Sequence, residues 1–161
     1  MKFSIPLFEL NYGTEEENAV LETLRSKWIS MGPKTINLEK RFSEELNVKY
    51  SLGVSNCTAA LHLACMAIGL KPGDEVICPS LTFVATANAI MYTGARPVFC
   101  DVVSVDNPTI NYRKIREAVT SKTKAIIVMH YGGFPCEMDE ILRIADENNL
   151  MIIEDACHGP L

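Results

Sequence analysis

Apolar and polar positions along residues 50–161 recur with two periods, one suited to short β-strands and the other to helices. The sequence predicts strands at 50–54, 75–79, 96–100, 124–129 and 150–153, and helices at 58–68, 83–92, 112–119 and 137–147. The run at 124–129 is almost entirely apolar, which is typical of a central parallel strand covered on both faces. Strands and helices that alternate at this spacing form βαβ units, so we expect an α/β fold with a mostly parallel sheet flanked by helices.

Residues 1–49 have a different pattern. Two helices are predicted at 15–27 and 34–46, and the connection between them contains Gly32 and Pro33. We therefore expect an N-terminal helical segment over residues 1–49 and an α/β domain over residues 50–161. Ligands of such sheets bind at the carboxyl ends of the strands, which directs the search for a site to the residues that follow each strand.

The composition excludes several classes of protein without choosing a function. A chain of 161 residues allows one domain or a piece of a larger one, and 48% hydrophobic with 22% charged residues is typical of a folded protein. The net charge is −5 and the basic residues are scattered, so we expect neither a nucleic acid nor a membrane as a partner. No apolar run approaches the roughly 20 residues that span a bilayer, and the first residues lack a signal-peptide pattern. These features favour the cytoplasm.

The six cysteines show no paired C-x-x-C spacing, and Cys65, Cys78 and Cys100 lie inside apolar stretches. The favoured interpretation is reduced, mostly buried thiols that pack as small hydrophobic side chains. One set of residues that could form a zinc site is Cys136, Cys157 and either His130 or His158. Because the usual ligand-pair spacing is missing from this set, a zinc site is the weaker interpretation.

The first candidate for ligand binding follows the predicted strand at 50–54, where residues 55–58 read Ser-Asn-Cys-Thr. A helix that begins there offers unpaired N–H groups and the positive end of its dipole, which suit a phosphate. Asn56 and Thr58 add short polar side chains that can bond phosphate oxygens. The same residue types are also ordinary helix N-caps, so this motif alone does not separate the two roles.

Phe83 and Asp155 follow two other predicted strands. A carboxylate at the end of an apolar strand needs a partner, and a protonated pyridine nitrogen would suit Asp155, with a loop cap or a magnesium ligand as alternatives. Its neighbour Glu154 must point to the opposite face of the strand. Phe83 can stack on a flat ring or be an ordinary core residue. A phosphate cradle, a stacking face and a carboxylate for a ring nitrogen are together what pyridoxal 5'-phosphate (PLP) needs besides a lysine.

At this point the residues are similar to those of a known family. The chain resembles the DegT/DnrJ/EryC1/StrS family of PLP-dependent sugar aminotransferases through essentially all of its length. The matching blocks are 28–33, 38–42, 55–64 (Ser-Asn-Cys-Thr-Ala-Ala-Leu-His-Leu-Ala), 72–76 (Pro-Gly-Asp-Glu-Val), 79–86, 88–89, 123–127, 128–135 (Val-Met-His-Tyr-Gly-Gly-Phe-Pro) and 154–159 (Glu-Asp-Ala-Cys-His-Gly). So many blocks in order make the resemblance specific. It implies part of the large domain of a fold-type-I PLP-dependent transferase.

The resemblance implies a role for each candidate residue. Thr58, with the amide groups beside it at Asn56 and Cys57, would hold the cofactor phosphate. Phe83 would stack on the pyridine ring, and Asp155 would pair with the ring nitrogen.

Two further residues stand beside this set. His158 occupies a position where many relatives have Gln, and either side chain would hydrogen-bond the ring hydroxyl. His130 would be a structural residue that shapes the pocket wall. Cys57 stands where many relatives have Gly, so the phosphate turn carries a side chain there.

The activity implied by the resemblance is amino transfer from a donor, glutamate, to a nucleotide-linked keto-sugar, which gives an amino sugar. In the family the lysine that forms the Schiff base follows the Asp-Ala block by a few tens of residues, whereas all nine lysines of this chain precede Asp155. The rest of the large domain and a small C-terminal domain would therefore lie outside these 161 residues, and the chain alone is expected to be inactive. The family also implies a homodimer, with the loop at 28–33 near the interface.

Three alternatives stay open. A sugar dehydratase of the same family has a histidine in place of the lysine, and the block at 155–158 looks more like that of the aminotransferases. A Rossmann-type nucleotide-binding protein should show G-x-G-x-x-G after its first strand, which residues 55–58 do not supply. The last alternative is a catalytically inactive truncated fragment.

Overall fold

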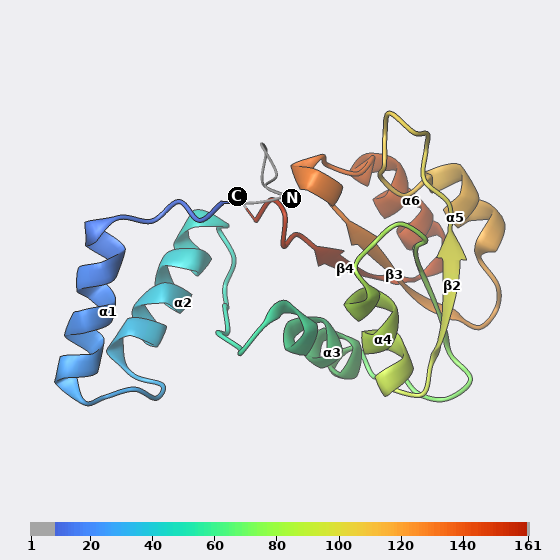
Figure 1. Cartoon of the computed structure of the whole chain (residues 1–161). Helices are drawn as coiled ribbons and strands as arrows, with labels where there is room; N and C mark the ends of the chain where they lie inside the picture. Colours follow the sequence, from blue (N-terminus) through green and yellow to red (C-terminus); the bar gives the residue numbers. More distant parts are fainter. Residues whose placement is uncertain (1–8, 161) are drawn as a thin grey trace, which may run out of the picture. The chain divides into compact units, whose positions relative to one another are not determined.

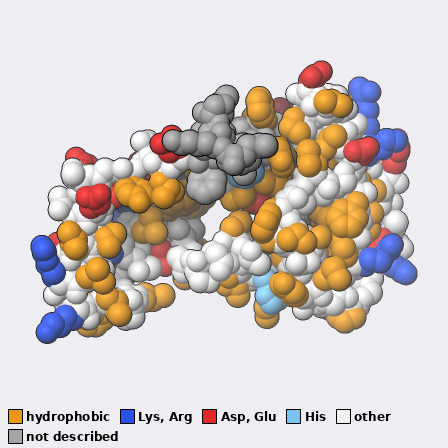
Figure 2. Space-filling view, in the orientation of Figure 1, with side chains coloured by type: hydrophobic (Ala, Val, Ile, Leu, Met, Phe, Trp, Pro, Cys, Tyr) orange, Lys and Arg blue, Asp and Glu red, His pale blue; other side chains and the backbone are white. Residues whose placement is uncertain are grey.

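The computed structural model describes residues 9–160, and the chain divides into two compact units between Gly53 and Val54. The first unit contains helices α1 (Thr14–Ser26) and α2 (Pro33–Glu45), as the sequence predicts. α1 begins with three glutamates in its first turn, where negative charge is favourable at the positive end of the helix dipole. Neither helix contains a buried residue, and hydrophobic side chains lie on their surface (Figures 1 and 2).

The second unit is a parallel four-stranded sheet with the order β2-β1-β3-β4. Its strands are β1 (Glu75–Pro79), β2 (Arg96–Cys100), β3 (Thr123–Met129) and β4 (Met151–Asp155). The helices are α3 (Cys57–Ala67), α4 (Val84–Tyr92), α5 (Tyr112–Ala118) and α6 (Met138–Asn148), with a short 3₁₀ turn, η1 (Tyr131–Gly133), after β3. The predicted α/β fold with a parallel sheet is confirmed.

Two apolar clusters sandwich the central strands, which is why β3 is apolar on both sides. Val76 of β1 and Ile127 of β3 pack with α3 and α4 on one face of the sheet. Ile77 and Ile126, the next residues in register, pack with α5 and α6 on the other face (Figure 1). The two faces hold the strands in one register, because a slip by one residue would exchange their side chains.

One predicted strand is wrong. Residues 50–54 form no strand, although their alternation of apolar and polar positions suits one. Tyr50 and Leu52 are 78% and 72% exposed. A strand is stable only when its backbone groups bond to a neighbouring strand, and among residues 9–160 no segment pairs with 50–54. The start of α3 is thus preceded by extended chain rather than by a strand.

The turn from α4 into β2 illustrates how tightly the second unit is packed. α4 is followed by Gly94, whose φ of +82° lies in the left-handed region. A Cβ at this position would lie 2.7 Å from Cγ of Pro72. The glycine therefore permits both the backbone turn and the close approach of the Pro72 ring.

Among the helices of the described residues, none is long and apolar enough to cross a membrane.

Candidate functional site

A pocket of about 440 Å³ lies at the carboxyl end of the sheet. It is lined by Asn56, Cys57, Thr58, Leu61, Thr82, Phe83, Ala85, Met129, Tyr131, Asp155, Cys157 and His158. All six residues expected from the sequence to bind a cofactor are therefore in one place. The pocket lies where the rule for parallel sheets puts ligands.

The start of α3 forms one wall of the pocket. Asn56 is the N-cap, and its side-chain oxygen accepts a hydrogen bond of 2.9 Å from the Ala59 N–H. The Ala60 N–H bonds to the Asn56 carbonyl at 3.1 Å. Because the first N–H groups of a helix have no partner within it, those of Cys57 and Thr58 are available to an anion. The Asn56 side chain is thus a cap, and its role is to fix the helix start.

Asp155 ends β4 and lies in the floor of the pocket, where it is only 3% exposed. Its Oδ2 accepts a hydrogen bond of 3.3 Å from the Thr86 hydroxyl, and its Oδ1 lies 3.3 Å from the Cys157 N–H. No lysine or arginine is among the residues that line this pocket. Among residues 9–160, the carboxylate is therefore buried with hydrogen-bond donors but without a positively charged side chain beside it. Glu154 is exposed on the other face of the strand, as alternation predicts.

The sequence analysis did not identify Thr86 as a residue of the site. Thr86 lies in the first turn of α4, is fully buried and connects Asp155 to Thr82, whose hydroxyl is 2.7 Å away. The Thr82 hydroxyl in turn reaches the Met129 sulfur at 3.0 Å. The sequence did contain a signal for Thr86, a hydroxyl on an otherwise apolar helix. Such a group must find a hydrogen-bond partner when it is buried.

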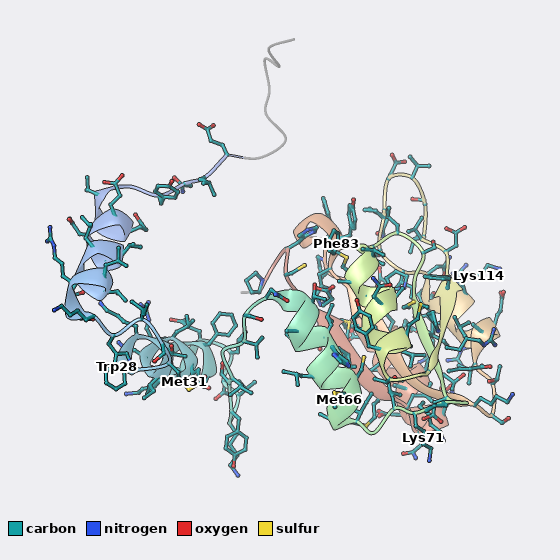
Figure 3. All side chains as sticks on the ribbon, turned by 60° about the horizontal axis from the view of Figure 1, so that its bottom comes forward. Trp28, Met31, Met66, Lys71, Phe83 and Lys114 are labelled. Carbon is teal, nitrogen blue, oxygen red and sulfur yellow. The ribbon has the colours of Figure 1, made fainter. Side chains whose placement is uncertain are left out.

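Phe83 lies at the N-cap of α4 and is 65% exposed. Figure 3 shows Phe83 and Lys71 at opposite ends of the sheet, and Lys71 precedes β1. An aromatic ring that lines a pocket and keeps most of its surface free is suited to stacking on a flat ligand. The alternative from the sequence, an ordinary core phenylalanine, is wrong because the side chain is not buried.

Two histidines lie near the carboxyl end of the sheet in different settings. His158 lines the pocket, and its Nδ1 accepts a hydrogen bond of 3.0 Å from the Gly132 N–H. Its ring meets the edge of Tyr131 at a centroid distance of 5.7 Å. His130 is not among the lining residues, because its ring is held by Glu154 at 3.1 Å and by the Cys136 N–H at 3.1 Å. His130 thus supports the loop rather than facing the pocket.

The cysteines fall into two groups. Cys65, Cys78, Cys100 and Cys136 are buried, whereas Cys57 and Cys157 are exposed. The Cys57 sulfur lies 3.7 Å from Oδ1 of Asp155. Although the Cys157 residue is exposed, partial desolvation of its thiol raises the pKa to about 12, and the neighbouring Asp155 carboxylate adds to the shift through a hydrogen bond to the thiol and through charge repulsion. The pKa of Cys57 is raised for the same two reasons.

Comparison with known proteins identifies the relatives of this chain. The sequence model of the DegT/DnrJ/EryC1/StrS aminotransferase family matches residues 11–160. The chain is 46% identical over 161 residues to the spore coat polysaccharide biosynthesis protein SpsC of Bacillus subtilis, with 99% of this chain and 40% of that protein covered. It is 44% identical over 162 residues to the GDP-perosamine synthase of Escherichia coli O157:H7, with 99% and 43% covered. The chain thus spans about two fifths of the length of these curated relatives.

Solved structures give the same result. The protein Spr1654 of Streptococcus pneumoniae in its PLP form has a TM-score of 0.89 at 30% identity, with 98% of this chain and 44% of that chain covered. NtdA of Bacillus subtilis with bound pyridoxamine phosphate (PMP) has a TM-score of 0.83 at 36% identity, with 89% and 33% covered. The chain belongs to the DegT/DnrJ/EryC1/StrS aminotransferase family.

Proposed function

We propose that the protein is a PLP-dependent aminotransferase that converts a nucleotide-linked keto-sugar into an amino sugar, with glutamate as the amino donor. This chain would supply the floor and the phosphate-binding wall of the cofactor site. Membership of the aminotransferase family supports this proposal. The name of the relative GDP-perosamine synthase refers to a sugar linked to a nucleotide, and SpsC is a polysaccharide biosynthesis protein.

The observation that carries the proposal is the buried carboxylate of Asp155. A carboxylate that is 3% exposed, without a lysine or arginine beside it in the pocket, is costly for the protein on its own. A ligand with a protonated ring nitrogen would supply both a positive charge and an N–H donor. PLP, when bound, acts as an electron sink during the reaction, and Asp155 maintains that property by keeping the ring nitrogen protonated.

The other residues fit the remaining parts of the cofactor. The N–H groups of Cys57 and Thr58 and the Thr58 hydroxyl form an anion site at the start of α3, suited to the phosphate. The exposed ring of Phe83 would cover one face of the pyridine. The ring of His158 is oriented by the Gly132 N–H through Nδ1, which leaves Nε2 as the nitrogen that can donate to the ring hydroxyl.

We also propose that a lysine from outside the described pocket completes the site, because none of the described lysines lines it.

The protein would act as a homodimer through the connection between α1 and α2. In this connection Trp28, Ile29 and Met31 are 61%, 78% and 66% exposed, and three such apolar side chains within four residues form a candidate contact surface for a second subunit. Ile29→Glu should convert the dimer to a monomer in light scattering, whereas Val105→Glu, at a residue that is 98% exposed, should not. A dimer that persists with Ile29→Glu contradicts this interface.

The function is tested with the protein expressed from its complete reading frame. It is incubated with PLP, ¹⁵N-glutamate and a panel of nucleotide-linked keto-sugars, and the products are analysed by mass spectrometry. We expect one sugar to gain the labelled nitrogen, and Asp155→Ala to abolish the transfer. A product that equals the sugar minus one water, without the labelled nitrogen, would show that the protein is a dehydratase and would contradict the proposed amino transfer. A protein that neither binds PLP nor transfers nitrogen would contradict it altogether.

A further inference from the structure

Three side chains in the pocket form a cluster of metal-ligand type. Cys57 is the first residue of α3, Asp155 is the last residue of β4, and Cys157 follows two residues later. Their sulfur and carboxylate oxygen atoms all lie within 4.8 Å of one another. Among residues 9–160 this is the only group of three or more such side chains at metal-binding distance. The set of Cys136, Cys157 and a histidine considered from the sequence does not come together in this way.

The spacing of the cluster is compatible with one tetrahedral site. With Zn–S bonds of about 2.3 Å and Zn–O bonds of about 2.1 Å, a tetrahedral angle puts sulfur and oxygen ligands about 3.6 Å apart and two sulfurs about 3.8 Å apart. The Cys57 sulfur and Oδ1 of Asp155 are 3.7 Å apart. The separation of the two sulfurs lies within the 4.8 Å limit of the cluster. Little movement is therefore needed to close three ligands around an ion.

The charge of the pocket favours the same conclusion. Asp155 is buried without a lysine or arginine among the lining residues, so the pocket carries negative charge that a cation can neutralise. Two sulfurs and one carboxylate oxygen are ligands that Zn²⁺ prefers, whereas Mg²⁺ and Ca²⁺ prefer oxygen alone. With three protein ligands, the fourth position would be open to water or to another small ligand.

We propose that Cys57, Asp155 and Cys157 form a binding site for a thiophilic divalent cation such as Zn²⁺. On binding, each thiol transfers its proton to solvent, so one Zn²⁺ replaces two protons and the site with its metal carries a charge of −1. The ion occupies the space in front of the Asp155 carboxylate. Zinc therefore excludes PLP, a consequence that rests on the proposed function, whereas the binding of zinc itself does not.

Metal binding is tested on the reduced protein without PLP, with Co²⁺ as a coloured probe for Zn²⁺. We expect a sulfur-to-cobalt charge-transfer band that Zn²⁺ removes. Cys57→Ser and Cys157→Ser should each weaken this band and weaken Zn²⁺ binding at least about tenfold, and the variant with both changes should lose the band. The matched control is Cys136→Ser, which replaces a cysteine outside the pocket; the serine hydroxyl can replace the thiol as donor to the Met129 carbonyl. This control should keep both the band and the affinity. Circular dichroism confirms that each variant is folded.

Two results would overturn the metal site. One is the absence of the charge-transfer band from the folded wild-type protein, and the other is a band that persists when Cys57 and Cys157 are both serine.

Competition between Zn²⁺ and PLP is then measured by equilibrium dialysis. Zinc should raise the apparent Kd for PLP in the wild type but not in the variant with both Cys57→Ser and Cys157→Ser. If zinc binds at the cluster and PLP binding is unaffected, the metal site holds and mutual exclusion is wrong, so the role of Asp155 toward the ring nitrogen is wrong as well. If PLP binds normally and zinc does not bind, the metal site fails and the proposed function stands.

Discussion

The substitution Asp155→Asn tests whether the Asp155 carboxylate serves to stabilise the fold or to bind a ligand. The change keeps the shape of the side chain and removes its charge. Thr86 donates to Oδ2 of Asp155, and its hydroxyl is 2.7 Å from that of Thr82, which reaches the Met129 sulfur. With an amide at position 155, the Thr86 hydroxyl can accept from the new NH₂ group and donate to Thr82. All the hydrogen bonds that connect residue 155, Thr86, Thr82 and Met129 can therefore be kept.

The expected effects on stability and on binding have opposite signs. The free energy of unfolding without cofactor should stay the same or rise, because a buried charge without a positive side chain beside it is removed. Binding of PLP should weaken, because a hydrogen bond to a charged group contributes about 1.5–3 kcal/mol. Since about 1.4 kcal/mol corresponds to a factor of ten, the Kd for PLP should rise about 10- to 150-fold.

The assay combines equilibrium dialysis against PLP with thermal unfolding in the presence and absence of PLP. Glu75→Gln is the matched control, because Glu75 is also a buried carboxylate but is paired with Arg96 at 2.7 Å and with the Thr120 hydroxyl at 2.7 Å. It lies at the first residue of β1, whereas the pocket lies at the carboxyl ends of the strands. Glu75→Gln should lower the melting temperature and leave the Kd for PLP unchanged.

The control also has a defined dependence on pH. The hydrogen bond from Arg96, followed by that from Thr120, lowers the pKa of Glu75 below its ordinary value of 4.5. The stabilisation by this pair is therefore complete above about pH 4.5 and is lost as the pH falls through the lower pKa of the folded state. Glu75→Gln should remove this part of the acid dependence.

For Asp155→Asn, a lower unfolding free energy with an unchanged Kd for PLP would refute the reasoning.

Three further predictions test the walls of the site and its support. Asn56→Ala should lower the free energy of unfolding by about 1 kcal/mol in chemical denaturation, because the Ala59 amide loses its cap; Asn56→Asp should keep the stability. Gly94→Ala should cost about 1–3 kcal/mol, because its φ is +82° and its Cβ would meet Pro72, so an unchanged midpoint would contradict this packing. Cys157 should react with iodoacetamide roughly tenfold or more slowly than free cysteine at mildly alkaline pH, because its pKa is raised to about 12. Mass spectrometry should show faster alkylation with Asp155→Asn, and equal rates would exclude the influence of the carboxylate.

Much of the fold follows from local sequence. The strands at 75–79 and 96–100 were predicted with their observed bounds, because turn residues precede each of them and their apolar runs are short. The segment at 50–54 shows why such patterns fail. Its alternation is as good as that of a real strand, but strand formation depends on a neighbour, and a local pattern carries no information about one.

The site was predictable to the extent that it follows from topology. Parallel strands end at the same edge, so residues after β1 and β4 were expected to meet. Contacts between side chains were not predictable in this way. Cys57 and Asp155 are 98 positions apart, and nothing in either local sequence indicates that a thiol would lie 3.7 Å from the carboxylate. For Thr86, the hydroxyl on an apolar helix indicated that a partner was needed, but the sequence did not show that this partner is Asp155, 69 positions away.

The two ligands proposed for the pocket should compete at only one end of it. The positive potential at the start of α3, equivalent to about half an elementary charge, attracts an anion at Cys57 and Thr58, whereas the Asp155 carboxylate attracts a cation. PLP carries both kinds of charge, so it occupies both ends, while Zn²⁺ binds to the Asp155 carboxylate and to the side chains of Cys57 and Cys157 and leaves the N–H groups of Cys57 and Thr58 free. Sulfate, a mimic of the phosphate, should therefore raise the melting temperature of the zinc-bound protein further, whereas the shifts from zinc and PLP should not add. Sulfate that displaces zinc would show that the two ends form a single site.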